Sequence, residues 1–104
     1  MILTNTDFIP EKKVQKILGV VKGNTVQSRW LGSDIAAALK NLVGGEIKGY
    51  TKLLSTAREE AVKRMTEEAE KLGADAVINI RFMTANIMAS SAEILVYGTA
   101  VKLK

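Results

Sequence analysis

Arg58 is the first side chain whose type and position could do chemistry. It follows Ala57 on the apolar flank of a helical stretch, within reach of Leu54 and Ala61. A guanidinium in such surroundings has to be paired or hydrogen-bonded, because burying it alone is costly. We favour a structural ion pair for Arg58. A neighbouring subunit's carbonyl and an anionic ligand are the alternatives.

Asn79 and Arg81 form a second polar feature, on a segment that alternates like a β-strand. They are interleaved with Ile78 and Ile80, so strand geometry predicts them on the face opposite the two isoleucines. From that face they could point into a subunit interface or the lumen of a ring. Arg58, Asn79 and Arg81 are therefore candidate ligand or interface residues.

The side chains available as metal ligands or nucleophiles argue against metal and thiol chemistry. The sequence has 0 Cys and 0 His, so disulfides, the commonest general base and the softest metal ligands are missing. Met65, Met83 and Met88 form no M-x-x-M pattern, and Met65 fits core filling better than metal binding. The carboxylates could hold a hard cation only where an oligomer axis gathers copies of one side chain. We predict no metal site and no cofactor.

An enzymatic function is not indicated either. No spacing pairs a nucleophile with a base, and neither glycine-containing segment, Gly19–Gly23 or Gly44–Gly49, matches a phosphate-binding loop. We therefore name no catalytic residue and expect a non-enzymatic protein.

Net charge points weakly toward nucleic acid. The chain has 15 Lys and Arg against 11 Asp and Glu, a net charge of +4. The basic cluster Lys12, Lys13 and Lys16 lacks the interleaved aromatic residues that stack on bases. We expect nucleic acid not to be the main partner.

Chain length and hydropathy indicate one domain, residues 1–104. The longest uncharged stretch, Phe82–Ala92, has about 11 residues and is too short to span a membrane. Because no basic segment precedes an apolar run at the N-terminus, we expect no secretory signal and a cytoplasmic location.

One long helix is predicted from Ile47 to Leu72. Apolar residues recur there at steps of three and four, and i,i+4 pairs such as Glu60 and Arg64 occupy the opposite face. Gly73 can take the left-handed conformation that closes a helix.

After this helix, the residues that share a face recur every two positions, as in a β-strand. Strands are predicted from Ala76 to Phe82 and from Glu93 to Leu103, and a third from Val14 to Val26. Ser33 or Asp34 could cap a short helix between the first strand and the long helix. The β-α-α-β-β order predicts a two-layer α/β domain of the α+β type, with one antiparallel sheet and helices on one side.

The strand Glu93–Leu103 is apolar on both faces, which one layer of helices cannot cover. Its Leu95 and Tyr97 fall on one face, and its Ile94 and Val96 on the other. Each Val, Leu or Ile left in water forgoes about 1.5–3 kcal/mol. We therefore predict a symmetric homo-oligomer whose copies cover the second face. A monomer with a somewhat apolar surface is the alternative.

Several motifs resemble the YbjQ family over nearly the whole chain. The first is ILGVVKGNTV (17–26) and the last is YGTAV (97–101). Between them, the run from Gly44 to Phe82 contains a double glycine, a tyrosine before an A-R pair, and L-G-A-D-A-V. The resemblance implies a dodecin-like subunit with an antiparallel three-stranded sheet of order 1-3-2, assembled into a pentameric ring. It also adds Tyr50 to the candidate ligand or interface residues.

The resemblance has two further implications. The family carries the description "putative heavy-metal-binding", which the donor set above does not favour. The family pattern often has Arg after the double glycine and Glu after the tyrosine, whereas this chain has Glu46 and Thr51, so a site built on that Arg or Glu would be lost or rebuilt.

These observations together predict an oligomeric binding or scaffold protein, a pentamer with a small unidentified ligand held at subunit interfaces. The alternative function is the heavy-metal binding that the family description implies.

Overall fold

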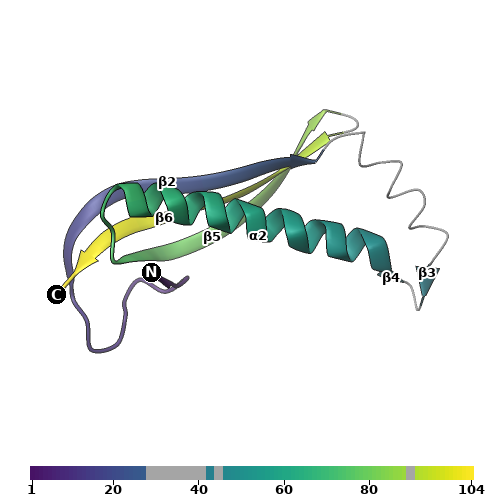
Figure 1. Ribbon diagram of the computed structural model, residues 1–104. Coiled ribbons are helices and arrows are strands. Elements are labelled where there is room, and N and C mark those ends of the chain that lie inside the picture. Colours follow the sequence, from purple (N-terminus) through teal and green to yellow (C-terminus); the bar gives the residue numbers. More distant parts are fainter. Residues whose placement is uncertain (28–41, 44–45, 89–90) are drawn as a thin grey trace.

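A computed structural model describes residues 1–27, 42–43, 46–88 and 91–104 (Figure 1). The short helix expected near Ser33 and Asp34 falls outside the described residues. The described elements are β1 (Ile2–Leu3), β2 (Val14–Gln27), β3 (Leu42–Val43), β4 (Glu46–Ile47), α2 (Lys48–Lys71), β5 (Ala76–Met88) and β6 (Ser91–Leu103).

The main sheet has four strands in the order β1-β5-β6-β2. The pairs β5–β6 and β6–β2 are antiparallel, whereas β1 runs parallel to β5. The α+β class is thus confirmed. The three-stranded antiparallel sheet of order 1-3-2 is wrong as a description of the whole sheet, because β1 adds a fourth strand and makes the sheet mixed. The pentameric ring stays a prediction.

The fourth strand escaped sequence analysis because it is very short. Ile2–Leu3 spans 2 residues, too few to show an alternating pattern. Its place is fixed by backbone hydrogen bonds: Ile2 N donates to Asp75 O at 3.3 Å, and Thr4 N donates to Val77 O at 3.0 Å. Only the tertiary fold brings these partners together.

The predicted long helix is confirmed within a residue at each end. It closes at Gly73, which has φ +76°, and Ala74 N donates to Ala69 O at 3.1 Å across the last turn. Arg64 and Glu60 form the predicted i,i+4 ion pair at 3.3 Å on its outer face.

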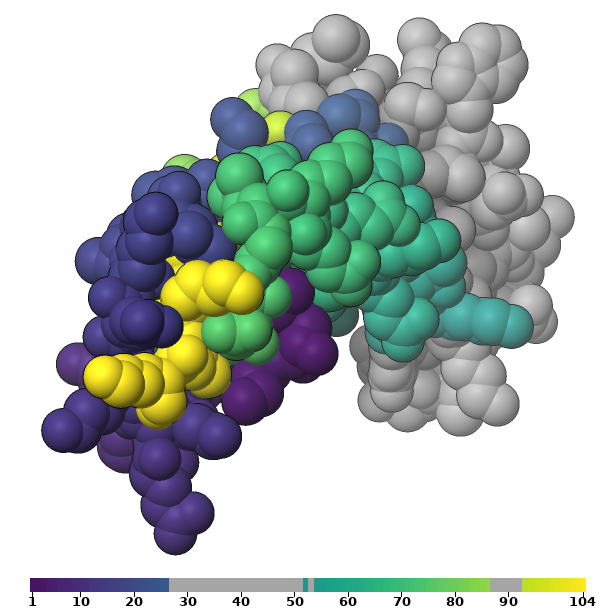
Figure 2. All heavy atoms as spheres, turned by 60° about the vertical axis from the view of Figure 1, so that its left-hand side comes forward, coloured from purple at the N-terminus to yellow at the C-terminus, as the bar shows by residue number. Residues whose placement is uncertain are grey.

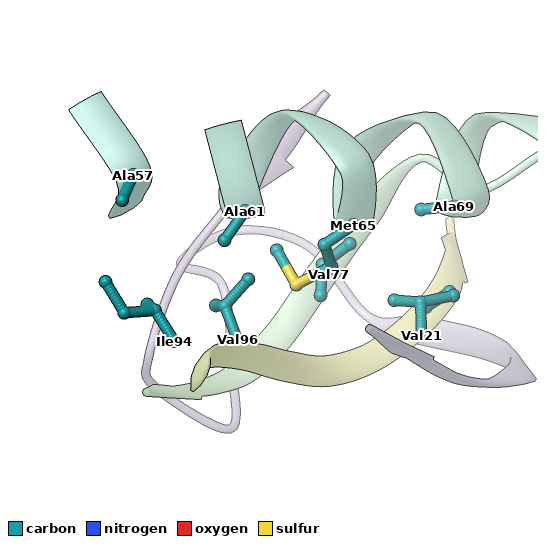
Figure 3. Packing of buried hydrophobic residues seen from close by; sticks show 9 residues of the cluster. Val21, Ala57, Ala61, Met65, Ala69, Val77, Ile94 and Val96 are labelled. Carbon is teal, nitrogen blue, oxygen red and sulfur yellow. The ribbon is translucent and has the colours of Figure 1, made fainter. Parts of the chain in front are cut away.

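The helix lies on one face of the sheet and packs mainly on β2 and β6 (Figures 1 and 2). Its inner stripe repeats every four residues, and Figure 3 shows this stripe above Val21 and Val96. The prediction that Met65 fills the core is confirmed, since its side chain is fully buried. The stripe consists of Ala57, Ala61, Met65 and Ala69.

Small residues let the helix backbone come unusually close to β2. A Cβ built on Gly23 would meet the carbonyl oxygen of Ala61 and would lie 2.5 Å from Met65 N. Two hydrogen bonds fasten the same region: Thr25 Oγ1 donates to Ala57 O at 3.3 Å, and Arg64 Nη1 donates to Asn24 O at 2.6 Å. Gly23 therefore sets the distance between the two layers.

A second, smaller cluster lies on the other face of the sheet. Ala76, Ile78 and Val101 are buried there, and Ile9 of the N-terminal segment packs against them. Backbone hydrogen bonds between Lys13 and Lys104, at 3.3 and 2.9 Å, hold the C-terminal residue to the residue that precedes β2. The chain itself thus covers one end of this face, which sequence analysis assigned to neighbouring copies.

Gly23→Ala should destabilise the fold, because the added methyl group meets helix backbone that cannot move without separating the layers. We expect a loss of about 1–3 kcal/mol, the range for overpacked cores, in the free energy of unfolding measured with urea. Gly19→Ala is the matched control, since nothing lies within 4 Å of a Cβ there and only its positive φ of 141° opposes the substitution. An unfolding free energy of Gly23→Ala equal to that of wild type would contradict the close approach at Gly23.

Asp75 should make stability depend on pH at the end of the sheet. Its carboxylate accepts a hydrogen bond from Leu103 N at 2.9 Å and lies 3.7 Å from Lys102 Nζ. The Leu103 hydrogen bond, and then the Lys102 charge, lower the pKa of Asp75 in the folded state. Because the folded pKa is below the unfolded one, the stabilisation is present above the unfolded pKa and disappears as the pH falls through the folded value.

We expect wild type to exceed Asp75→Asn in unfolding free energy near pH 7 and to lose that advantage in acid. Urea unfolding at a series of pH values measures the difference, with Asp7→Asn at an exposed position as the control for a lost charge. A difference that stays constant down to strongly acidic pH would show that Asp75 does not act through its charge.

Candidate functional site

The four sequence-derived candidates are not brought together. Arg58 lies on α2 with an exposed side chain, so no burial cost forces it into an ion pair, and neither ion pair among the described residues includes it. Tyr50 belongs to the first turn of α2, and its side chain lies outside what the structure describes. Asn79 and Arg81 lie on β5.

A β-bulge at Asn79 changes which residues of β5 share a face. Ile78 pairs with Thr99, but Arg81 pairs with Tyr97, so β5 carries one extra residue between the two pairs. Asn79 has φ +54°, a left-handed conformation that asparagine tolerates better than most residues. Its backbone N donates to Thr6 O at 3.0 Å.

The predicted alternation across this segment is therefore wrong. Ile78 joins the cluster on the outer face, whereas Ile80 packs against the core beneath the helix. Without the extra residue, Ile80 would oppose Tyr97, and Arg81 would oppose the buried Val96. The bulge keeps the guanidinium of Arg81 out of the core, where an unpartnered charge is costly.

Arg81 is held in a defined position on the exposed face. Its Nη1 donates to Asn5 O at 2.8 Å and to Ile80 O at 3.0 Å. Both acceptors are neutral carbonyls, so they orient the side chain and leave its positive charge uncompensated.

Two further residues, neither of them a sequence-derived candidate, line up with Arg81 across the sheet. Tyr97 pairs with Arg81 on one side and with Lys22 on the other. All three lie on the face away from α2, because their neighbours Val21 and Val96 are buried beneath the helix. We call Lys22, Tyr97 and Arg81 the cation–tyrosine row. Alternation could have assigned each residue to a face, but only the strand register brings the three side by side.

The cation–tyrosine row carries a local excess of positive charge. The ion pairs among the described residues are Arg64–Glu60 and Lys102–Asp75, and neither involves the row. The carboxylate of Glu93, also on this face, accepts a hydrogen bond from Asn24 Nδ2 at 3.0 Å. The row can therefore attract an anion, and the tyrosine between its two cations offers a flat ring for stacking.

Metal-binding geometry does not appear in the part of the chain that the structure describes. No group of three or more Asp, Glu, His or Cys side chains converges there. With 0 His and 0 Cys in the sequence, a soft metal would depend on thioethers, and Met65 is fully buried in the core. The residues present do not fit a heavy-metal site.

Among the described helices, none is both long enough and apolar enough to cross a membrane. The expected cytoplasmic location stays a prediction.

The fold is similar to that of a solved structure. The crystal structure of a protein with unknown function from Pediococcus pentosaceus ATCC 25745, which belongs to the DUF74 family, superimposes with a TM-score of 0.66. The alignment covers 100% of this chain and 98% of the other at 16% sequence identity. At that identity the likeness concerns the fold alone.

Sequence comparison gives closer relatives. A UPF0145 protein of Thermotoga maritima is 61% identical over 104 residues, which cover 100% of this chain and 98% of the relative. A UPF0145 protein of Archaeoglobus fulgidus is 57% identical over 104 residues, 100% of this chain and 96% of the relative. The YbjQ family model, described as "Putative heavy-metal-binding", matches residues 1–104. The chain therefore belongs to the YbjQ family, which includes these UPF0145 proteins.

Proposed function

We propose that the protein is a non-enzymatic, homo-oligomeric binding protein that holds a small ligand where its copies meet. The observation that carries this proposal is the exposed apolar surface of β2. Ile17, Val20 and Val26 are 67%, 72% and 53% exposed on this strand. Burying such side chains in an interface contributes about 1.5–3 kcal/mol each.

The backbone of β2 supports the same proposal. β2 has 14 residues and is the last strand of the described sheet, where β6 is its only pairing partner. A long edge strand with exposed β-branched residues is a template for pairing with another chain. A second copy that met this edge would satisfy backbone groups and cover apolar side chains together.

The overall dimensions also favour association. The Cα radius of gyration is 16.7 Å, with extents of 52 × 28 × 17 Å, whereas a compact domain of about 100 residues has a radius near 13 Å. Among the described residues α2 is the helix that covers the sheet, and it lies on one face, so the other face is available to neighbours. A ring of five copies is the assembly that we propose.

Heavy-metal binding, the function named in the family description, has weaker support from this chain. Thiolate and imidazole are the ligands that soft metals prefer, and the sequence contains neither. Among the methionines whose side chains the structure describes, Met1 and Met83 are exposed and Met65 is buried, and no thiolate or imidazole accompanies these thioethers. We therefore place the ligand-binding role ahead of the metal-binding one.

The assembly proposal predicts that Val20→Lys combined with Val26→Lys yields a smaller species than wild type. Two added charges would have to be desolvated in the interface, so association should weaken. Size-exclusion chromatography with light scattering at micromolar concentration measures the masses. Leu72→Lys, at an exposed apolar position outside the sheet, is the matched control and should keep the wild-type mass. A wild-type protein that elutes with the mass of one chain would refute the proposal.

The donor set predicts no stoichiometric binding of Zn²⁺, Cd²⁺ or Cu(I) tighter than micromolar. Equilibrium dialysis of the full chain against each metal alone measures this. Tight binding of Cu(I) that is lost in Met83→Leu would assign a site to that thioether. Tight binding of any of the three metals would overturn the preference for a metal-independent ligand.

A further inference from the structure

We propose that the cation–tyrosine row binds a mononucleotide, with the base stacked on the ring of Tyr97 and the phosphate held by Lys22 and Arg81. The inference rests on the proposed binding role and adds the chemical class of the ligand. It does not depend on how many copies assemble.

Strand register makes the row compact. Tyr97 lies on the inner strand β6, with Lys22 opposite it on β2 and Arg81 opposite it on β5. Cα atoms of directly opposed residues are about 4.5–5.5 Å apart, so the two cations flank the ring with their Cα atoms about 10 Å apart. A phosphate beside a base stacked on Tyr97 is within reach of the Lys22 side chain, and of Arg81 when its guanidinium exchanges Asn5 O for the phosphate.

The two positive charges of the row favour a negatively charged ligand. Two cations without an ion-pair partner among the described residues face the same solvent, and bringing them together is unfavourable until an anion arrives. Arg81 is already oriented by the carbonyls of Asn5 and Ile80, and both bonds use the single nitrogen Nη1. The bond to Asn5 O holds the guanidinium at the β1 side of β5, so it has to turn toward Tyr97 when it binds a phosphate oxygen, for which its other nitrogens are available.

The aromatic ring of Tyr97 favours a ligand with a flat ring that can stack on it. Tyr97 is 39% exposed, which leaves part of its surface accessible for stacking. Leu95, half-buried in the next position on this face of β6, extends the apolar surface beside it. Bases stack on such rings without regard to sequence.

The number of rings favours a single nucleotide over a nucleic-acid strand. Single-strand binders place several aromatic rings along a basic groove, one for each successive base. On the outer face of the described sheet Tyr97 is the only aromatic residue, because the register puts Phe82 opposite Val96 on the helix side. One ring can stack one base.

Isothermal titration calorimetry of the full chain tests the inference, with AMP and ATP as the ligands. Inorganic triphosphate, adenosine and a short oligothymidine serve as comparisons. We expect ATP to bind more tightly than either triphosphate or adenosine, because both parts of the molecule are recognised. Tyr97→Leu and Lys22→Gln should each weaken ATP binding about tenfold or more. Tyr97→Phe, which keeps the ring, should bind like wild type.

Lys63→Gln is the matched control, since it removes an exposed cation from α2 and should leave ATP binding unchanged. Lys22→Gln keeps the proposal testable if Tyr97→Leu does not fold, because no described hydrogen bond involves the Lys22 side chain. Circular dichroism of each variant establishes folding.

Three results would overturn the inference: no binding of either nucleotide, equal binding of triphosphate and ATP with no effect of Tyr97→Leu, or binding of the oligothymidine alone. Light scattering on the same samples separates this inference from the assembly proposal. Oligomers that bind no nucleotide would refute only the ligand class, whereas single chains that bind ATP would refute only the assembly.

Discussion

The close contact between α2 and β2 at Gly23 is the constraint on which the rest of the structure depends. A helix normally stands off a sheet by the length of its side chains, but here alanines and a glycine bring backbone against backbone. The two layers can then be fastened by hydrogen bonds from Thr25 and Arg64 directly to main-chain carbonyls. Directional bonds at a close-packed contact fix the position of the helix along β2 as well as its distance.

This placement of the helix decides what the sheet leaves exposed. Because α2 covers β2 and β6, the residues of these strands that point toward it are buried, and alternate residues must point away. The N-terminal segment covers that outer face only around Val101 and Ile78. The outer face beyond that cluster carries Tyr97 between two cations and the exposed valines of β2. The surface available for a ligand and for other copies is therefore a consequence of one-sided helix packing.

Sequence patterns predicted the long elements and the two layers, but neither the short strands nor the registration. The three- and four-residue steps from Ile47 to Leu72 predicted α2 almost to the residue, and strand patterns predicted β2, β5 and β6, although β5 continues to Met88, beyond its predicted end at Phe82. Alternation failed at Asn79, where one additional residue moves Ile80 to the other face. Asparagine tolerates the left-handed conformation, but no local pattern shows that β5 gains its additional residue at this position. The left-handed conformation of Asn79 is stabilised by pairing with Thr6, a residue more than seventy positions away.

The candidate site was only partly predictable for the same reason. Arg81 was recognised because a polar residue in an apolar strand is conspicuous, whereas Lys22 and Tyr97 each look ordinary in their own strands. Their significance is a property of the register, which the bulge sets by placing Arg81 opposite Tyr97. An energetically unfavourable irregularity in β5 thus both avoids burying a charge and completes a surface that combines two positive charges with an aromatic ring. In this fold, the departure from regular alternation is the feature that links the structure to the proposed ligand site.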